Sequence, residues 1–168
     1  MPALTTVPRR RGNSLGGGAA AYREGSLYAR SFRGDTEVYD ATSGSALQTI
    51  VGGLAPAIGT LGYFVQGGEL HAMLSGHSTS AWTFTGHGVV TAPVVAGGYV
   101  VVAGSTVPSG NNNTLWILTA PTGSLVATTT LPGDVLIPDE WSYTAPLTGM
   151  AVADGMLFVP TSIGLVAY

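Results

Sequence analysis

Short apolar segments separated by glycine-containing turns recur along this chain. One stretch, TAPVVAGGYVVVAG from Thr91 to Gly104, is almost wholly apolar, yet Pro93 stands near its start and Gly97-Gly98 in its middle. Glycine supplies the positive φ that a two-residue hairpin turn needs. The stretch is therefore predicted to form two β-strands folded back on each other.

Three further stretches repeat this arrangement of apolar segment, glycine-ended turn and second β-prone segment. They are AAAYREGSLYAR from Ala19, PAIGTLGYFVQG from Pro56 and GMAVADGMLFVP from Gly149. Each stretch has a glycine at the end of its predicted turn. Successive turn glycines are 37, 36 and 57 residues apart. The predicted turn glycines are Gly25, Gly62, Gly98 and Gly155.

A third and a fourth β-prone segment follow each hairpin. The third segments are TEVYDAT, ELHAML, TLWILTA and the final GLVAY, and the fourth segments are ALQTI, SAWTFTG and SLVATTTLPG. Turns are predicted around Gly44, Gly76 and Gly123, between the third and fourth segments. Four short antiparallel strands that recur about every 36 residues have the period of a β-propeller blade.

The predicted fold class is all-β, with about four blades of four antiparallel strands in a single domain of residues 1–168. The expected blades cover about residues 19–50, 55–86, 92–133 and 147–168. Residues 1–18 are expected to hold a fourth-strand-like segment, ALTTVP, followed by a basic, glycine-rich linker.

The repeat resembles the PQQ-like (pyrroloquinoline-quinone-type) repeat of bacterial β-propellers, of the BamB-like and quinoprotein-like kind. The resemblance is carried by PVVAGGYVVVAG, LWILTAPTGSLVATTTLPG and VYDATSGSALQTI, and it extends over residues 19–168. The tryptophan that closes each repeat in this family is present only as Trp82.

The sequence is compatible with two arrangements of the blades. In one, ALTTVP (Ala3 to Pro8) pairs beside Gly164–Tyr168 and closes a ring of four blades. In the other, which the large rings of this repeat family favour, the chain is about half of a seven- or eight-bladed propeller. Such a half would expose two sheet faces and tend to self-associate, or to join the remainder of a larger propeller.

Charge and composition exclude several functions. Only 9% of the 168 residues are charged, and there is no cysteine, so disulfides and thiolate metal sites are absent. All six cations are arginines within residues 1–33, which contain one acid and carry a net charge of +5. The remaining residues hold eight acids and no Lys or Arg, so the body of the chain is not expected to bind nucleic acid.

The same composition favours an extracytoplasmic or cell-envelope location. The polar surface must come from Ser, Thr, Asn and Gly, as in many secreted β proteins. The N-terminus lacks the apolar segment of a signal peptide, so an export signal would lie outside these residues. The longest apolar run, Ala92 to Gly104, has 13 residues, so no transmembrane segment is predicted.

Two insertions mark a candidate binding site. They are STVPSGNNNT (Ser105–Thr114) and GDVLIPDEWSYTAP (Gly133–Pro146), and blade topology predicts that both emerge on one rim. Amides and carboxylates beside aromatic rings suit a sugar, a peptide or calcium, whereas a structural role in turns and blade edges is the alternative. The candidate residues are Asn111, Asn112, Asn113, Asp139, Glu140, Trp141 and Tyr143.

No catalytic set stands out. Asp139 and Glu140 are adjacent and would point in opposite directions on an extended segment. His71, His77 and His87 lack metal-ligand spacing. The sequence therefore predicts a non-catalytic scaffold, without cofactor, that binds a protein or a polysaccharide.

The alternative is a fragment of a PQQ-dependent quinoprotein dehydrogenase. The resemblance implies that such an enzyme would use PQQ and calcium, with Glu, Asn and Asp ligands and a tryptophan beneath the quinone. A sugar-cleaving propeller enzyme is a third hypothesis, and it would need a carboxylate pair that the sequence does not clearly offer.

Overall fold

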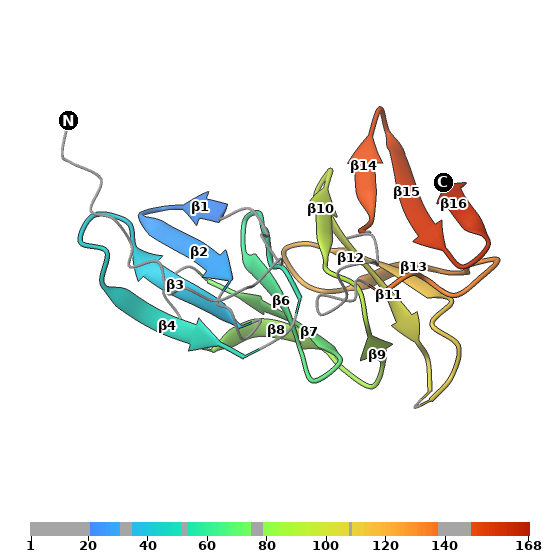
Figure 1. Cartoon of the computed structure of the whole chain (residues 1–168), viewed down its shortest axis with the longest axis horizontal. Coiled ribbons are helices and arrows are strands. Elements are labelled where there is room, and N and C mark those ends of the chain that lie inside the picture. The colour runs from blue at the N-terminus through green and yellow to red at the C-terminus, as the bar shows by residue number, and fades with distance from the viewer. Residues whose placement is uncertain (1–20, 31–34, 52–53, 75–78, 108, 138–148) are drawn as a thin grey trace, which may run out of the picture.

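A computed structural model describes residues 21–30, 35–51, 54–74, 79–107, 109–137 and 149–168, and these ranges contain β-strands but no helix (Figure 1). Within them, therefore, no helix is long and apolar enough to cross a membrane. The strands form four antiparallel sheets that follow one another along the chain, here called blades 1 to 4. The predicted all-β fold of antiparallel blades is confirmed.

Blades 1 and 2 each contain four strands in sequence order. The strands of blade 1 are β1 (Ala21–Arg23), β2 (Ser26–Arg30), β3 (Thr36–Asp40) and β4 (Ala46–Ile50). The strands of blade 2 are β5 (Ala57–Ile58), β6 (Gly62–Gln66), β7 (Glu69–Met73) and β8 (Ser80–Phe84).

Blade 3 has a fifth strand that pairs beside its longest strand, and the described part of blade 4 has three strands. The strands of blade 3 are β9 (Gly88–Val89), β10 (Val94–Ala96), β11 (Tyr99–Ser105), β12 (Thr114–Thr119) and β13 (Leu125–Thr130). The strands of blade 4 are β14 (Ala151–Ala153), β15 (Met156–Thr161) and β16 (Gly164–Ala167).

The blades stack face to face and form an open arc. Blade 1 and blade 4 lie at opposite ends of the molecule, so these described sheets do not close a four-bladed ring (Figure 1). The predicted partial propeller is thus confirmed. The N-terminal segment that was considered as a closing strand lies outside the described residues.

Each pair of adjacent blades encloses its own hydrophobic cluster. Tyr28 and Val38 of blade 1 pack with Phe64 and Met73 of blade 2. The cluster between blades 2 and 3 is the largest of the three and is built around Tyr63, Leu70 and Trp116. The cluster between blades 3 and 4 joins Leu115 to Leu157 and Val159. The backbone of each long strand therefore sends alternate side chains to the preceding and the following blade.

Three of the four predicted hairpin turns have the same geometry. Gly25, Gly98 and Gly155 have φ of 80°, 83° and 75°, and the residue before each also has a positive φ. Two consecutive residues with positive φ are typical of the type I′ turn, which matches the twist of the flanking strands. The opening stretch is therefore the hairpin of β10 and β11, as predicted.

The prediction for Gly62 is wrong. Gly62 is the first residue of β6 and pairs with Ile58, so the β5–β6 turn lies before it, at residues 59–61. A Cβ on Gly62 would lie 2.7 Å from the Phe64 ring, so glycine serves close packing here. The two-glycine turn of blade 2 comes one connection later, at Gly67 and Gly68, with φ of 58° and 81°.

The turns between the third and fourth strands repeat in blades 1 and 3. Gly44 and Gly123 have φ of 70° and 69°, and their N–H groups donate to the carbonyls of Asp40 and Thr119, each at 2.8 Å. Hydrogen bonds donated by Ser43, the backbone N–H first, lower the pKa of the exposed Asp40 carboxyl. These two turns confirm the prediction, and the one around Gly76 lies outside the described residues.

The segment that enters a blade is held by the two blades it connects. The Val89 N–H donates to the Gly68 carbonyl of blade 2 (2.8 Å), and the Val90 N–H donates to the Ala103 carbonyl of blade 3 (3.0 Å). The next connection repeats this pattern, because Val135 bonds to Asn112 of blade 3 (2.8 Å) and Leu136 to Pro160 of blade 4 (3.0 Å). These backbone bonds fix the order and spacing of the blades.

Trp82 makes a second link between blades 2 and 3. Its Nε1 donates to the Ala120 carbonyl at 3.1 Å, and the Tyr63 hydroxyl donates to the same oxygen at 3.0 Å. The indole lies over the β12–β13 turn, where a Cβ on Gly123 would come within 2.5 Å of the ring. The absence of a side chain on Gly123 therefore leaves the space in which the Trp82 ring packs.

We expect Gly104→Ala to lower the free energy of unfolding by about 3 kcal/mol, as severe overpacking does. A Cβ at this position would lie 1.9 Å from the Gly88 carbonyl oxygen, and this backbone atom is fixed by the β9–β11 pairing. The control is Gly149→Ala, which has no atom within 4 Å of the added Cβ. Urea denaturation of both variants measures the effect, and equal stability would contradict the close approach.

Trp82→Ala should lower the free energy of unfolding by about 2 kcal/mol, less than for a fully buried tryptophan because Trp82 is half-buried. Trp82→Phe keeps the ring packing and loses one hydrogen bond, so a loss of about 1 kcal/mol is expected. Thermal denaturation followed by circular dichroism compares the two variants. If Trp82→Phe were as damaging as Trp82→Ala, the ring contact with Gly123 would not matter.

Candidate functional site

The predicted patch is only partly within the described residues. Asn111, Asn112 and Asn113 lie in the loop between β11 and β12. The other predicted members, which are Asp139, Glu140, Trp141 and Tyr143, lie outside the described residues. The proposed grouping of amides, carboxylates and aromatic rings therefore stays a prediction.

The two insertions do meet where the structure describes them. The Asn112 carbonyl accepts a bond from the Val135 N–H, and the Asn113 carbonyl accepts one of 2.6 Å from Leu131. Asn111 is exposed, whereas Asn112 and Asn113 are half-buried. The backbone of this loop therefore holds the connection to blade 4.

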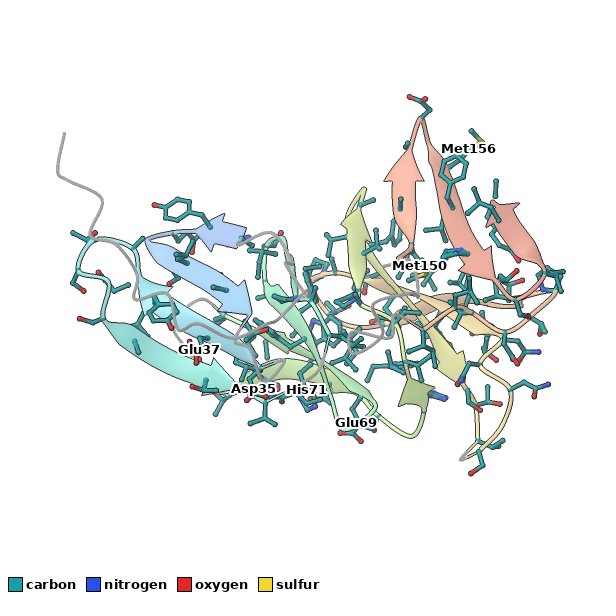
Figure 2. All side chains as sticks on the ribbon, viewed as in Figure 1. Asp35, Glu37, Glu69, His71, Met150 and Met156 are labelled. Carbon is teal, nitrogen blue, oxygen red and sulfur yellow. The ribbon has the colours of Figure 1, made fainter. Side chains whose placement is uncertain are left out.

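The described histidines lie in separate, local environments. His71 of β7 lies 3.0 Å from the Ser80 hydroxyl through Nδ1 and 3.7 Å from Glu69 through Nε2, and Figure 2 labels both Glu69 and His71. The His87 ring stacks on Phe84 with the centroids 4.5 Å apart. Within the described ranges, no three His, Cys, Asp or Glu side chains are grouped so that they could hold a metal ion.

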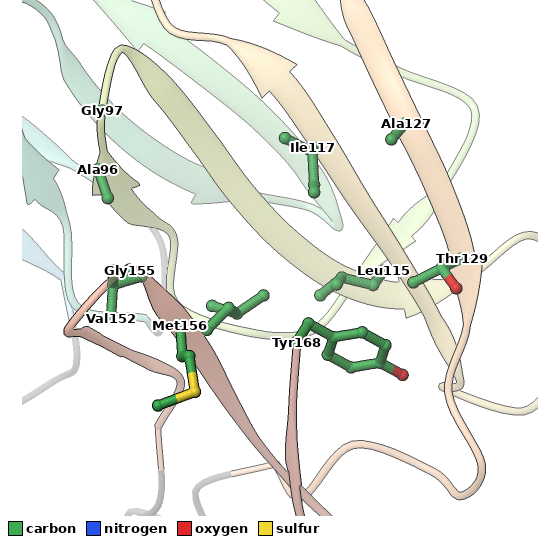
Figure 3. Close-up of a pocket in the computed structure, with 11 residues that line it drawn as sticks. Ala96, Gly97, Leu115, Ile117, Ala127, Thr129, Val152, Gly155, Met156 and Tyr168 are labelled. Atoms are coloured by element: carbon green, nitrogen blue, oxygen red, sulfur yellow. The ribbon is translucent and has the colours of Figure 1, made fainter.

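A concave site lies between blades 3 and 4 and is here called the interblade cleft. Its volume is ≈ 560 Å³, within the usual range for ligand sites. Blade 3 contributes residues of β10, β12 and β13, and blade 4 contributes the β14–β15 hairpin and Tyr168 (Figure 3). The residues that define it best are Leu115, Ile117, Ala127, Thr129, Val152 and Tyr168.

The cleft exists because blade 3 has small side chains where blade 2 has large ones. Trp82 pairs with Ala72 in blade 2, and Ala127 pairs with Ile117 at the same point of blade 3. Both positions come directly before the register shift between the third and fourth strands. Thus the place that an indole fills between blades 2 and 3 stays open between blades 3 and 4.

The second missing side chain is a phenylalanine. Phe84 pairs with Leu70 in blade 2, and Thr129 pairs with Leu115 at the same point of blade 3. Phe84 packs against the cluster between blades 2 and 3, whereas Thr129 lines the interblade cleft. The cleft is therefore a vacancy of aromatic size in a repeated blade-to-blade interface.

The chemistry of the cleft is mostly apolar. Aliphatic side chains of both blades form its walls, and the hydroxyls of Thr129 and Tyr168 are its labelled polar groups (Figure 3). Tyr168 is 46% exposed, so its ring is accessible from outside. Such a site can take an apolar or aromatic group through burial of its surface, with two hydroxyls available for a polar atom.

Neither a family model nor a curated protein matches the sequence. Solved structures with a similar arrangement of blades are known. BamB from Moraxella catarrhalis is similar with a TM-score of 0.64 and 18% identity, over 89% of this chain and 41% of that one. The chain has a PQQ-like β-propeller fold.

Two further structures share this fold. The quinohemoprotein alcohol dehydrogenase ADHIIG from Pseudomonas putida HK5 is similar with a TM-score of 0.61 and 16% identity, over 84% of this chain and 28% of that one. The computationally designed Ika4 protein is similar with a TM-score of 0.63 and 14% identity, over 93% of each chain. The chain thus spans less than half of BamB and of the dehydrogenase, and the likeness concerns the fold.

Sequence reasoning missed the interblade cleft of this PQQ-like propeller. The signal was present in the fourth segments of the repeat, where AWTFT in one blade corresponds to VATTT in the next. The loss of two aromatic residues at equivalent positions indicates an underfilled interface only once the strand register is known. The insertions drew attention to the loops instead.

Ala127→Trp should fill the interblade cleft and raise the free energy of unfolding by about 1 kcal/mol, because it buries an indole between two blades. Thr128→Trp is the matched control, since successive side chains of a strand point to opposite faces. Urea denaturation measures both variants. A stabilisation of equal size in the control would contradict the assignment of Ala127 to the cleft.

Proposed function

We propose that this chain is a non-catalytic propeller module that binds another protein, and that the interblade cleft takes an apolar or aromatic side chain of that partner. The observation that carries the proposal is the replacement of Trp82 and Phe84 by Ala127 and Thr129 at equivalent positions. The cleft is open to an incoming side chain and complementary to the groups that fill the neighbouring interface.

The chemistry of the cleft favours a protein over a polysaccharide. A sugar site needs several hydrogen-bonding groups around its rings, and the described lining of the cleft is dominated by aliphatic side chains. An aromatic or aliphatic side chain of a partner buries its whole surface at such a site, which is how the anchor residues of protein interfaces act. A location at the cell envelope belongs to this proposal and rests on composition and on the resemblance to BamB.

Binding to an array of random twelve-residue peptides, with a glycan array in parallel, tests the proposal. We expect the chain to select peptides rich in Trp, Phe and Leu. Selected peptides should bind Ala127→Trp at least tenfold more weakly, because the added indole occupies the cleft, while Thr128→Trp binds them normally. Binding to glycans alone, unchanged in Ala127→Trp, would show that the proposal is wrong.

The second candidate is a fragment of a PQQ-dependent dehydrogenase, which the likeness to the quinohemoprotein alcohol dehydrogenase favours. The cleft is lined by no carboxylate, and the described ranges hold no group of three His, Cys, Asp or Glu side chains that could bind a metal ion, so this candidate rests on the fold alone. Titration with PQQ and calcium, followed by quinone absorbance, separates the two candidates. Saturable binding would favour the enzyme fragment.

A further inference from the structure

One position of the repeat is buried in three blades and exposed in the fourth. Leu70 pairs with Val65, Leu115 with Ala103, and Leu165 with Pro160, so the three leucines occupy the same point of their blades. Their exposed fractions are 0%, 1% and 68%. The counterpart in blade 1, Thr36, is 2% exposed.

The next blade is what buries this position. Leu70 shares a cluster with Val100 and Val102 of β11, and Leu115 shares one with Leu157 and Val159 of β15. The face of a blade that carries this position therefore receives the second strand of the blade that follows. In blade 4 the corresponding surface, here called the docking face, contains Phe158, Pro160, Leu165 and Ala167.

The docking face has the composition of an interface. All of its four members are apolar, and β15 and β16 contain no charged residue. Ile163, in the turn beside it, is 67% exposed. A contiguous apolar surface of this kind marks a site of association.

A complementary surface is present at the other end of the same chain. Leu27 and Ala29 of β2 stand where Val100 and Val102 stand in β11, because both pairs face away from the blade that follows. Both are half-buried, and Tyr22, which pairs with Leu27, is 67% exposed. Blade 1 thus presents the kind of surface that covers a docking face elsewhere in the molecule.

We propose that the docking face of blade 4 packs against blade 1 of a second copy of this chain, and that two copies close reciprocally into an eight-bladed ring. Each copy contributes one blade 4 and one blade 1, so the two contacts are identical and related by a twofold axis. Eight blades lie within the usual range of propellers. The partner is identified by the repeat itself, since a blade is what covers this face at the three other interfaces.

Size-exclusion chromatography with light scattering on the whole chain gives the first test. We expect a species of twice the 17.0 kDa mass of the chain. Leu165→Asp places a charge in the docking face and should weaken the dimer at least tenfold. Leu125→Asp is the matched control, because Leu125 is 53% exposed on β13 and lies away from the docking face, so this variant should stay dimeric.

Cross-linking gives a second test that does not depend on the aspartate variant. The natural chain has no cysteine, so Ala29→Cys and Ala167→Cys each introduce a single thiol. A mixture of the two variants should give a mixed dimer with a short bismaleimide, and either variant alone should give little.

A chain that is monomeric at 100 micromolar would overturn the proposal, and so would open-ended polymers or efficient cross-linking of Ala167→Cys to itself. Ala127→Trp should remain dimeric, because the interblade cleft lies inside one chain. Loss of peptide binding and loss of dimerisation are therefore separate results.

Discussion

The packing of one sheet face against the next is the interaction on which this structure depends. Only 9% of the residues are charged, and each described hydrophobic cluster lies between two blades. A single blade has two apolar faces and too little core to be stable alone. Every blade is therefore stabilised by its neighbours, and the order of blades is set by the backbone bonds of the connecting segments.

The repeat was readable from the sequence because it depends on local chemistry. Gly25, Gly98 and Gly155 mark turns that need a positive φ, and this requirement is visible without any knowledge of the fold. Gly62 looked the same but has another cause, the close approach of the Phe64 ring. A glycine that is required by packing cannot be told from one required by a turn until the register is known.

The features that sequence reasoning missed are those that depend on contacts between blades. The strand β9 was missed because its two residues are too few to show a strand pattern. It is held by blade 2 through the Val89–Gly68 bond and by blade 3 through its pairing with Gly104. The cleft at Ala127 needs the same knowledge, because small residues in a strand are unremarkable until their counterpart is seen to be Trp82. The predicted convergence of the insertions followed from topology alone, and its described part, at Asn112 and Val135, shows the two segments bonded to each other.

The same constraint explains why the two proposed roles, binding and assembly, fall on different surfaces. An interface between blades can be filled, underfilled or left without a neighbour. Trp82 represents the first case, Ala127 the second and Leu165 the third.

An underfilled interface keeps its two blades in place through the backbone bonds of Val135 and Leu136, so it offers a preformed site for one side chain. An exposed face has no such support and needs a surface as large as a blade. A single side chain is therefore large enough to fill the cleft, whereas a surface as large as a blade is needed to cover the docking face.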